Sequence, residues 1–508
     1  MAKVITAAEA AALIQDGWSI AVGGFVGSGH PEALSRALES RFLSQGRPKG
    51  LSLMCSAGQG DGKRLGMNHF AHPGMLRRVI GGHWNWAPKL GEMAVDNQFE
   101  AYNLPQGTLV QLYGAMACGQ PGVITKTGLG TFVDPRQQGG RLNEVTTRDL
   151  VELIHLDGEE WLRYKPVRLD AVLLRGTSAD PQGNISTQRE AVRLELLQMA
   201  QAARSQGGIV IVQVEELVPE GGIPPKEVTV PGVSVDYVVL ARPEEHWQTY
   251  DEAYSPIFAG MERKPLNTLA PLPLDIRKVI ARRAFQEITS RCVVNLGIGI
   301  PEGVAGVANE AGRASDIVLT VEAGGIGGVP AGGLSFGAVY NASATMEHSQ
   351  QFAFYDGGGL DVTCLGFAQA DQAGNVNVSR FNGRIAGCGG FINITQNTNK
   401  VIFCGGFTAG SSEIQVRDGA LRIVRDGAVK KFISAVEQIS FSAGYAVRTG
   451  KRVLYVTERA VFSLSEEGLV LEEIAPGVDL ERDILGRMGF EPLVSKRLRE
   501  MPRELFLP

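Results

Sequence analysis

The chain carries one short pattern twice, once in each half. Segments 170–184 and 361–375 share a first Asp, an Ala-Asp pair and a final Gly-Asn pair, aligned without a gap. Each pattern predicts a buried strand followed by two tight turns. Upstream, segments 20–32 and 293–302 both consist of an apolar run, a glycine turn and a Pro-Glu pair. Because the features recur in the same order, the chain is predicted to fold as two similar halves.

Short apolar runs alternate with stretches of helical periodicity. Runs that are apolar along their whole length suit strands buried on both faces, as in parallel sheets covered by helices. The runs that indicate such strands are 171–174, 209–212, 237–240 and 401–404. Pro31 is expected to be the first residue of a helix that extends to Phe42. We therefore predict an α/β fold of two similar open α/β domains, with mostly parallel sheets covered by helices.

A proline-rich stretch separates the two predicted halves. A chain of 508 residues is too long for one ordinary hydrophobic core. Between residues 242 and 273 the alternating pattern stops. We predict an N-terminal domain over 1–241, a linker over 242–273, and a C-terminal domain over 274–508 that carries the candidate catalytic residue.

Charge and composition argue against several classes of protein. The 49 basic and 54 acidic side chains give a net charge of −5 without a basic run, so neither nucleic acid nor an anionic membrane is an expected partner. No apolar stretch is long enough for a membrane span or a signal peptide, and we expect a cytoplasmic protein. The six cysteines are scattered, and His30, His69, His72 and His83 are irregularly spaced. No metal site is therefore expected.

One carboxylate stands among glycines at the end of a predicted strand. Glu322 leaves the strand predicted at 319–324 and enters the glycine-rich run 323–328, whereas the matching position of the first half holds Ser56. Ligands gather at the carboxyl ends of parallel strands, and glycines let a bulky ligand approach. A desolvated carboxylate beside an oxyanion hole can attack an acyl group. On these grounds alone, a nucleophile and a surface glutamate beside a flexible turn remain equally open.

Several motifs resemble those of the family I CoA-transferases, in particular the long single-chain propionate and acetate CoA-transferases. The resemblance extends from Val4 to about Leu485. Segment 321–324 is similar to the nucleophile segment of the family, although many relatives read Ser-Glu-Asn-Gly where this chain reads Val-Glu-Ala-Gly. The other similar segments are the glycine signature at 23–31, the Pro-Gln-Gly segment at 103–108, a substrate-side loop at 128–136 and a glycine loop at 385–391.

The resemblance implies roles for particular residues. Glu322 would be the catalytic carboxylate, and the side chain of Gln106 would form an oxyanion hole with the backbone N–H of Gly389 or Gly390. The glycines expected to contact substrate or CoA are Gly24, Gly27, Gly29, Gly297, Gly299, Gly324 and Gly387. The plainer interpretation of Gln106 and of Gly389 and Gly390 is turn chemistry. Segment 295–301 resembles a dinucleotide fingerprint, but Pro301 breaks its spacing.

The resemblance also implies a reaction. Coenzyme A would pass from a short-chain acyl-CoA to a free carboxylate of the acetate or propionate type, by a ping-pong mechanism through a glutamyl-CoA thioester. Coenzyme A would be a co-substrate, with no permanently bound cofactor and no metal. The partners would be acyl-CoA and small carboxylic acids, and the chain would form a homo-oligomer, a dimer or a tetramer. An acyl-CoA hydrolase on the same fold, a non-catalytic sensor of CoA or sugar phosphates, and an oxidoreductase remain as alternatives.

Overall fold

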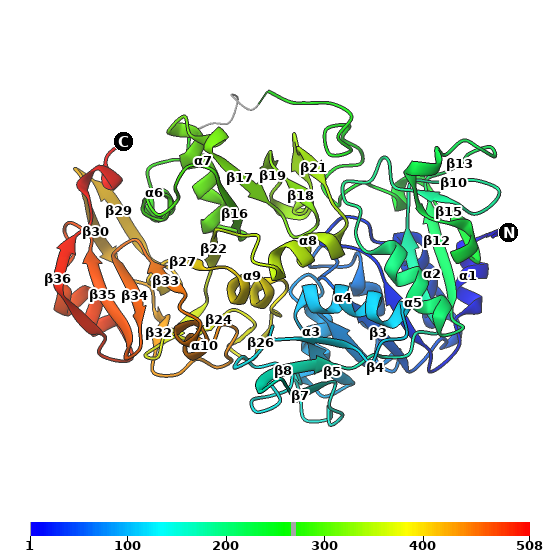
Figure 1. Ribbon diagram of the computed structural model, residues 1–508, viewed down its shortest axis with the longest axis horizontal. Helices are drawn as coiled ribbons and strands as arrows, with labels where there is room; N and C mark the ends of the chain where they lie inside the picture. The colour runs from blue at the N-terminus through cyan, green and yellow to red at the C-terminus, as the bar shows by residue number, and fades with distance from the viewer. Residues whose placement is uncertain (1, 266–270) are drawn as a thin grey trace.

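The computed structural model describes residues 2–265 and 271–508, and two β-sheets with flanking helices organise it (Figure 1). The first sheet has eight strands, and every neighbouring pair is parallel. Their order is β1 (Lys3–Ile5), β15 (Tyr237–Leu240), β12 (Ile209–Val214), β9 (Ala171–Arg175), β2 (Ser19–Val22), β3 (Leu51–Cys55), β4 (Leu76–Gly81) and β5 (Glu100–Asn103).

The second sheet has ten strands, of which the central five are parallel. Antiparallel strands extend it on both sides, and the outermost strand on one side pairs parallel with its neighbour. Their order is β21 (Ala344–Thr345), β18 (Gly325–Ile326), β17 (Ile317–Thr320), β16 (Cys292–Leu296), β22 (Val362–Gly366), β27 (Lys400–Cys404), β33 (Arg452–Val456), β34 (Ala460–Ser465), β35 (Gly468–Ile474) and β36 (Leu493–Glu500).

The repeat seen in the sequence is a repeat of topology. The order β15-β12-β9-β2-β3 in the first sheet corresponds to β33-β27-β22-β16-β17 in the second. The Gly-Asn turns also match, since Gly183 donates its backbone N–H to the carbonyl of Asp180 and Gly374 to that of Asp371, at 2.9 Å in both cases. The predicted fold class is confirmed. The antiparallel pairs at the margins of the second sheet are an addition that the apolar runs did not reveal.

Helices cover both faces of the sheets, which explains the continuous apolar runs. In β9, Val172 and Leu174 pack into one core and Ala171 and Leu173 into another, on the opposite face of the sheet. The helices are α1 (Ala7–Leu13), α2 (Glu32–Gln45), α3 (Pro88–Val95), α4 (Gln106–Ala117), α5 (Leu196–Ser205), α6 (Ile276–Phe285), α7 (Gly303–Glu310), α8 (His348–Asp356), α9 (Phe391–Asn397) and α10 (Ala443–Arg448). The prediction for Pro31 was wrong by one residue, because Pro31 is the N-cap and α2 begins at Glu32.

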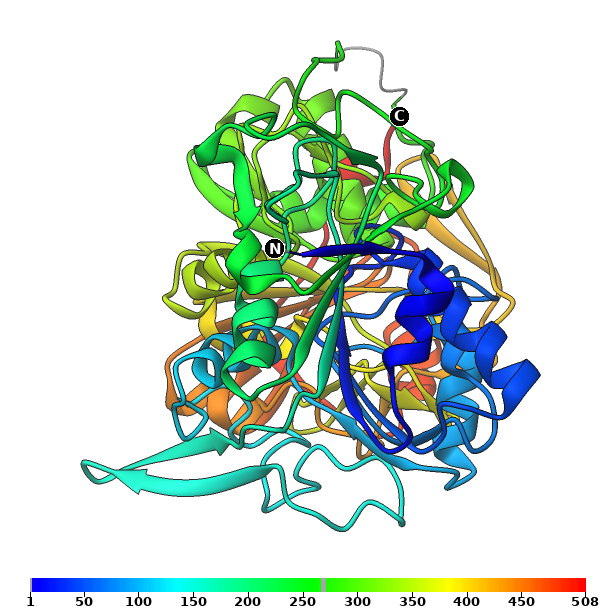
Figure 2. The same cartoon turned by 90° about the vertical axis from the view of Figure 1, so that its right-hand side faces the viewer.

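Further strands of both halves lie outside the two main sheets. An antiparallel hairpin of β7 (Val151–Leu156) and β8 (Glu159–Tyr164) projects from the first half (Figure 2). The remaining strands are β6 (Val123–Thr125), β10 (Ser178–Ala179), β11 (Ile185–Ser186), β13 (Glu216–Leu217), β14 (Val228–Val230), β19 (Val329–Pro330), β20 (Val339–Tyr340), β23 (Gln369–Asp371), β24 (Val376–Asn377), β25 (Arg380–Phe381), β26 (Arg384–Ile385), β28 (Thr408–Ala409), β29 (Glu413–Arg417), β30 (Ala420–Arg425), β31 (Val429–Lys430) and β32 (Phe432–Ile433).

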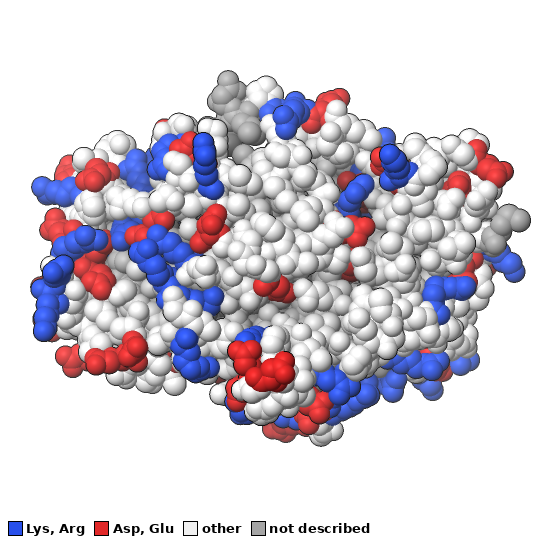
Figure 3. All heavy atoms as spheres, viewed as in Figure 1, with Lys and Arg blue, Asp and Glu red and all other residues white. Residues whose placement is uncertain are grey.

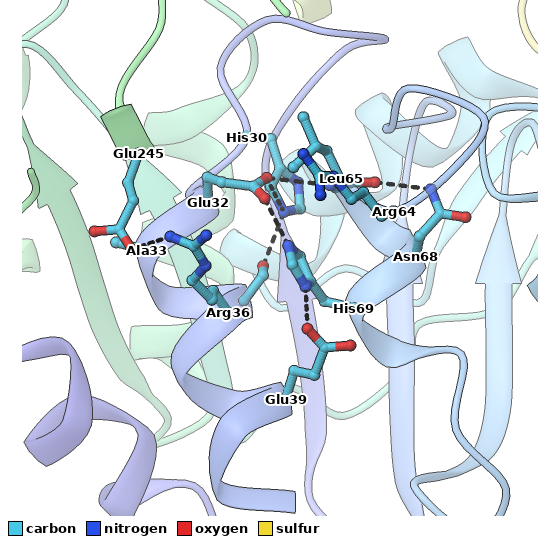
Figure 4. A network of polar contacts seen from close by, with 12 residues as sticks. His30, Glu32, Ala33, Arg36, Glu39, Arg64, Leu65, Asn68, His69 and Glu245 are labelled. Carbon is cyan, nitrogen blue, oxygen red and sulfur yellow. Dashed lines mark hydrogen bonds and ion pairs between the residues drawn. The ribbon is translucent and has the colours of Figure 1, made fainter. Parts of the chain in front are cut away.

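A buried polar network holds the start of α2 (Figure 4). The ring of His69 contacts Glu32 through Nε2 and Glu39 through Nδ1, each at 2.5 Å. Burial by itself lowers the pKa of His69, but the hydrogen bonds and charges of the two carboxylates outweigh it and raise that pKa. Tyr250 donates its hydroxyl to Glu32 at 2.8 Å. This contact ties the predicted linker to the first half.

The same stretch of chain also reaches the second half. The carboxylate of Asp251 accepts the backbone N–H of Leu334 at 2.8 Å. Residues 266–270 of the predicted linker lie outside the described residues.

Charged side chains are unevenly distributed over the face of the molecule in Figure 3. On the face in Figure 3, charges of both signs are interspersed at the two ends, and the middle is largely uncharged. Among residues 2–265 and 271–508, no helix is long and apolar enough to span a bilayer. The same residues contain no group of three or more His, Cys, Asp or Glu side chains arranged to hold a metal ion.

Candidate active site

A cavity of 340 Å³ lies between the two halves at the carboxyl ends of the parallel strands. Its wall includes six of the proposed site residues, which are Gln106, Gly297, Glu322, Gly387, Gly389 and Gly390. Apolar and aromatic side chains form much of the remaining wall, among them Phe25, Trp86, Ile298, Leu365 and Phe367. Both halves are therefore needed to build the cavity.

Glu322 lies in a tight turn that projects its side chain into the cavity wall. The turn joins β17 to β18, and the backbone N–H of Gly324 donates to the carbonyl of Val321 at 3.0 Å. Gly324 has a φ of +115°, and a Cβ atom there would lie 2.1 Å from the carbonyl oxygen of Met346. Burial of the Glu322 carboxyl among apolar groups raises its pKa to about 7.

Gln106 is the first residue of α4 and reaches Glu322 from the other half. Its amide Nε2 donates to a carboxylate oxygen of Glu322 at 3.4 Å. The backbone of Gln106 is fixed across the interface as well, since its N–H donates to the carbonyl of Gly389 at 2.9 Å. The Pro-Gln-Gly segment thus begins a helix, and it brings an amide donor to the carboxylate.

The two candidate backbone donors are not equivalent. The N–H of Gly389 already donates to the carbonyl of Gly82 at 2.7 Å. The N–H of Gly390 has no acceptor among the described residues. A Cβ atom at Gly390 would lie 2.9 Å from the carboxyl carbon of Glu322, so a larger residue there would displace the carboxylate. The geometry favours Gly390 over Gly389 as the free donor beside the carboxylate.

The remaining predicted glycines lie outside the cavity wall. A Cβ atom at Gly24 would meet Gln59, one at Gly29 would meet Leu194, and one at Gly27 would lie 2.2 Å from the carbonyl oxygen of Leu334. Close packing within the protein accounts for glycine at these three positions. Gly324 supports the turn described above. Gly299 has open space around it and a φ of +89°.

Sequence reasoning missed several residues of the site. Asn103 connects the halves, because its amide nitrogen donates to the carbonyls of Gly81 and Gly82 while its oxygen accepts the N–H of Cys388. His83 lines the cavity, and burial lowers its pKa to about 4. His348 contacts Gln106 from α8. Asn103 directly precedes the Leu-Pro-Gln segment, but no sequence pattern pointed to His348.

Known proteins resemble the chain along its whole length. The sequence profile described as Coenzyme A transferase matches residues 4–241. The chain is 47% identical to the caffeate CoA-transferase of Acetobacterium woodii over 100% of this chain and 98% of the relative. It is 44% identical to the acetate CoA-transferase YdiF of Escherichia coli K12, over 99% and 95%. The crystal structure of the acyl-CoA transferase YdiF apoenzyme from Escherichia coli O157:H7 matches with a TM-score of 0.95 and 43% identity, over 100% and 96%. The chain therefore belongs to the coenzyme A transferases, enzymes that use coenzyme A as a co-substrate.

Proposed function

We propose that this enzyme transfers coenzyme A from an acyl-CoA to a free carboxylate through a thioester on Glu322. The observation that carries the proposal is that the Glu322 carboxylate accepts a hydrogen bond from Gln106 and lies beside Gly390, whose N–H is free. The amide of Gln106 comes from the first half, and the free N–H of Gly390 comes from the second. A buried carboxylate beside such donors suits acyl transfer.

The reaction begins with attack on the thioester. An oxygen of Glu322 forms a bond to the carbonyl carbon of the acyl-CoA, and negative charge develops on the carbonyl oxygen. The amide of Gln106 and the N–H of Gly390 donate to that oxygen. The carbon–sulfur bond then breaks, the coenzyme A thiolate leaves, and an acyl-glutamyl anhydride remains.

The thiolate next attacks the carbonyl carbon of Glu322 itself. The anhydride bond breaks, the first carboxylate leaves, and coenzyme A is joined to Glu322 as a thioester. An acceptor carboxylate reverses both steps and leaves as the new acyl-CoA. The energy of the thioester is carried over, so the steps need no metal, no nucleotide triphosphate and no permanently bound cofactor.

The substrates are small carboxylic acids and their CoA esters. The cavity of 340 Å³ has a largely apolar wall, which suits a short acyl chain of the acetate or propionate type. The names of the relatives given above refer to caffeate and acetate as substrates of those proteins. A solved structure of YdiF that is 42% identical to this chain is described as a thioester complex with CoA, and it supports the covalent intermediate proposed here.

Coenzyme A enters along the wall contributed by the second half. Gly297 and Gly387 lie in that wall, together with Ile298, Leu365 and Phe367. Gly299, with open space where a Cβ atom would lie, is proposed to lie along the same path. Apolar groups of this kind suit the pantetheine arm, and binding energy from the remote nucleotide helps to drive chemistry at the thioester.

The test is to trap the intermediate. The enzyme is incubated with an acyl-CoA and no acceptor acid, digested, and the peptide that contains Glu322 is weighed. We expect a CoA adduct that disappears in Glu322→Ala. An unmodified peptide during measurable turnover would contradict the proposal. Product analysis with and without an acceptor acid distinguishes transfer from hydrolysis, because a hydrolase releases free CoA without the acceptor.

We also propose that the enzyme works in the cytoplasm as a homodimer or homotetramer. All six cysteines are free thiols, and five of them are buried, as suits a reducing compartment. Sedimentation equilibrium of the purified chain measures the oligomeric state, and a mass equal to one chain would contradict this part of the proposal.

A further inference from the structure

A chain of buried hydrogen bonds continues from Gln106 away from the cavity. The amide Nε2 of Gln106 lies 3.0 Å from Nε2 of His348, and Nδ1 of His348 lies 2.7 Å from a carboxylate oxygen of Glu195. Ser56 donates its hydroxyl to the other oxygen of that carboxylate. None of these four residues is more than 2% exposed. Apart from Gln106, none has a part in the transfer steps described above.

The neighbours of His348 decide which ring nitrogen carries the hydrogen. An amide nitrogen can only donate, so Nε2 of His348 accepts from Gln106. The carboxylate of Glu195 can only accept, so Nδ1 carries the hydrogen. If the Gln106 amide were reversed, its oxygen would face a carboxylate oxygen of Glu322 at 3.4 Å. The hydrogen-bond network therefore selects one tautomer and one amide orientation.

The backbone is strained at the same place. Leu194, which precedes Glu195, has a φ of +54°, a region that branched residues rarely adopt. The carbonyl of Leu194 accepts the backbone N–H of His348 at 3.3 Å. Such strain persists only where the surrounding structure holds it, and it clusters at functional sites. Here it accompanies the turn that places Glu195 against His348.

We propose that Ser56, Glu195 and His348 are positioning residues for the transfer reaction and that they act through Gln106. Glu195 fixes the tautomer of His348, and His348 fixes the amide of Gln106. One N–H of that amide is thereby held toward the developing oxyanion. A donor held in place beforehand stabilises the charge without reorienting during the reaction. The inference rests on the proposed role of Gln106 as an oxyanion donor.

The decisive variant is Glu195→Gln. An amide at position 195 can donate to Nδ1 of His348 and so move the ring hydrogen to Nε2. Two donors then face each other, and the amide of Gln106 must turn its oxygen toward His348. That orientation removes the oxyanion donor. We expect kcat to fall about 10²-fold with little change in KM, as for Gln106→Ala.

Coupling between the variants separates positioning from general damage. If Glu195 acts through Gln106, adding Glu195→Gln to Gln106→Ala lowers kcat by less than about threefold. Independent structural damage instead multiplies the two losses. His348→Gln keeps an acceptor near the Nε2 position, so it should retain more activity than His348→Leu.

Glu39→Gln is a matched control, because Glu39 is a partly buried carboxylate paired with His69 and lies outside the cavity. It should leave kcat within about twofold of the wild type. If Glu195→Gln does not fold, Ser56→Ala tests the positioning role instead, since it removes only one hydrogen bond to Glu195. We expect a loss of about three- to tenfold in kcat that disappears in the Gln106→Ala background.

The adduct on Glu322 keeps this inference separate from the proposed function. If the wild type forms no CoA adduct, the proposed function fails. If the wild type forms the adduct while Glu195→Gln and Ser56→Ala keep wild-type kcat, only the positioning role fails. Losses that multiply in the Gln106→Ala background also overturn it.

Discussion

The raised pKa of Glu322 sets a condition on its proposed role as nucleophile. Burial is the largest cause of a pKa of about 7, and the hydrogen bond from Gln106 acts in the opposite direction. A carboxyl group with this pKa is only partly ionised at neutral pH, and only the ionised form attacks a thioester. Burial therefore reduces the population of the reactive form, while it removes water that would hydrolyse the intermediates.

The first prediction concerns pH. As the pH falls below about 7, the carboxyl group of Glu322 gains a proton, so kcat/KM for an acyl-CoA should fall about tenfold for each further pH unit. Above about pH 8 it should be constant until other groups titrate. Initial rates measured from about pH 5 to about pH 9, with a fixed acyl-CoA, check this. A flat profile across neutral pH would contradict the pKa or the role of Glu322.

The second prediction concerns stability. Because the pKa of Glu322 is raised on folding, its protonation favours the folded state, and that contribution is lost as the pH rises through about 7. Glu322→Gln removes this dependence. We expect the free energy of unfolding of the variant, relative to the wild type, to rise between about pH 5 and 7 and to stay constant above pH 7. The total difference is on the order of 3 kcal/mol at most. Urea denaturation at about pH 5 and pH 8 measures it, and an equal difference at both would count against it.

At the scale of elements, three helices meet around the site and approach one another through glycines. A Cβ atom at Gly107 in α4 would lie 2.2 Å from the ring of Phe352 in α8. The N–H of Gly107 donates to the side chain of Asn393 in α9 at 3.1 Å. Gly390 directly precedes α9 and faces Glu322. Small residues at these contacts let helices from both halves converge on one carboxylate.

The third prediction belongs to the start of α9. Gly390 has a φ of −79°, which alanine adopts readily. The added Cβ would clash with the side chains of Glu322 and Phe352. Gly390→Ala should keep the fold and lower kcat by about 10²-fold through displacement of the carboxylate. Gly114→Ala in α4 is the control, since a Cβ there meets nothing within 4 Å. That variant should keep full activity and gain about 0.5–1 kcal/mol of stability. Activity near the wild-type level in Gly390→Ala would disagree with the close packing.

The elements differ in how far the sequence could predict them. Strands β9 and β27 follow from uninterrupted apolar runs, because both faces are buried and packing dictates the residue type. The turn at Asp371 follows from local hydrogen bonding, which depends on near neighbours alone. His348 could not be predicted, since its contact with Glu195 joins residues far apart in the chain. Long-range side-chain pairs of this kind leave no periodic signal.

At the scale of the whole molecule, the halves are joined by polar contacts as well as by the shared cavity. Asp356 of α8 accepts from Gln111 of the first half at 2.8 Å, and from Asn393 and Asn397 at 3.0 and 2.9 Å. Burial is the largest influence on Asp356 and raises its pKa to about 6. The carboxylate therefore collects three amide donors at the interface of the halves.

The fourth prediction concerns this interface. Asp356→Ala leaves the three amide donors without their common acceptor, and we expect it to lower the free energy of unfolding by about 2–4 kcal/mol. Asp149→Ala is the comparison, because its ion pair with Arg141 is exposed and should contribute less than about 1 kcal/mol. Urea denaturation of both variants tests this. A loss in Asp356→Ala no larger than in Asp149→Ala would contradict a structural role at the interface.

The correspondence of Ser56 and Glu322 bears on the stoichiometry of the enzyme. The strand order equates the two halves, yet the Ser56 hydroxyl is enclosed and bonded to Glu195, while Glu322 opens to the cavity. The two halves thus share a topology but differ at this position, with the proposed nucleophile in the second half and the proposed positioning residue in the first. Active-site titration with acyl-CoA should then saturate at one covalently bound CoA per polypeptide, whatever the number of chains in the assembly.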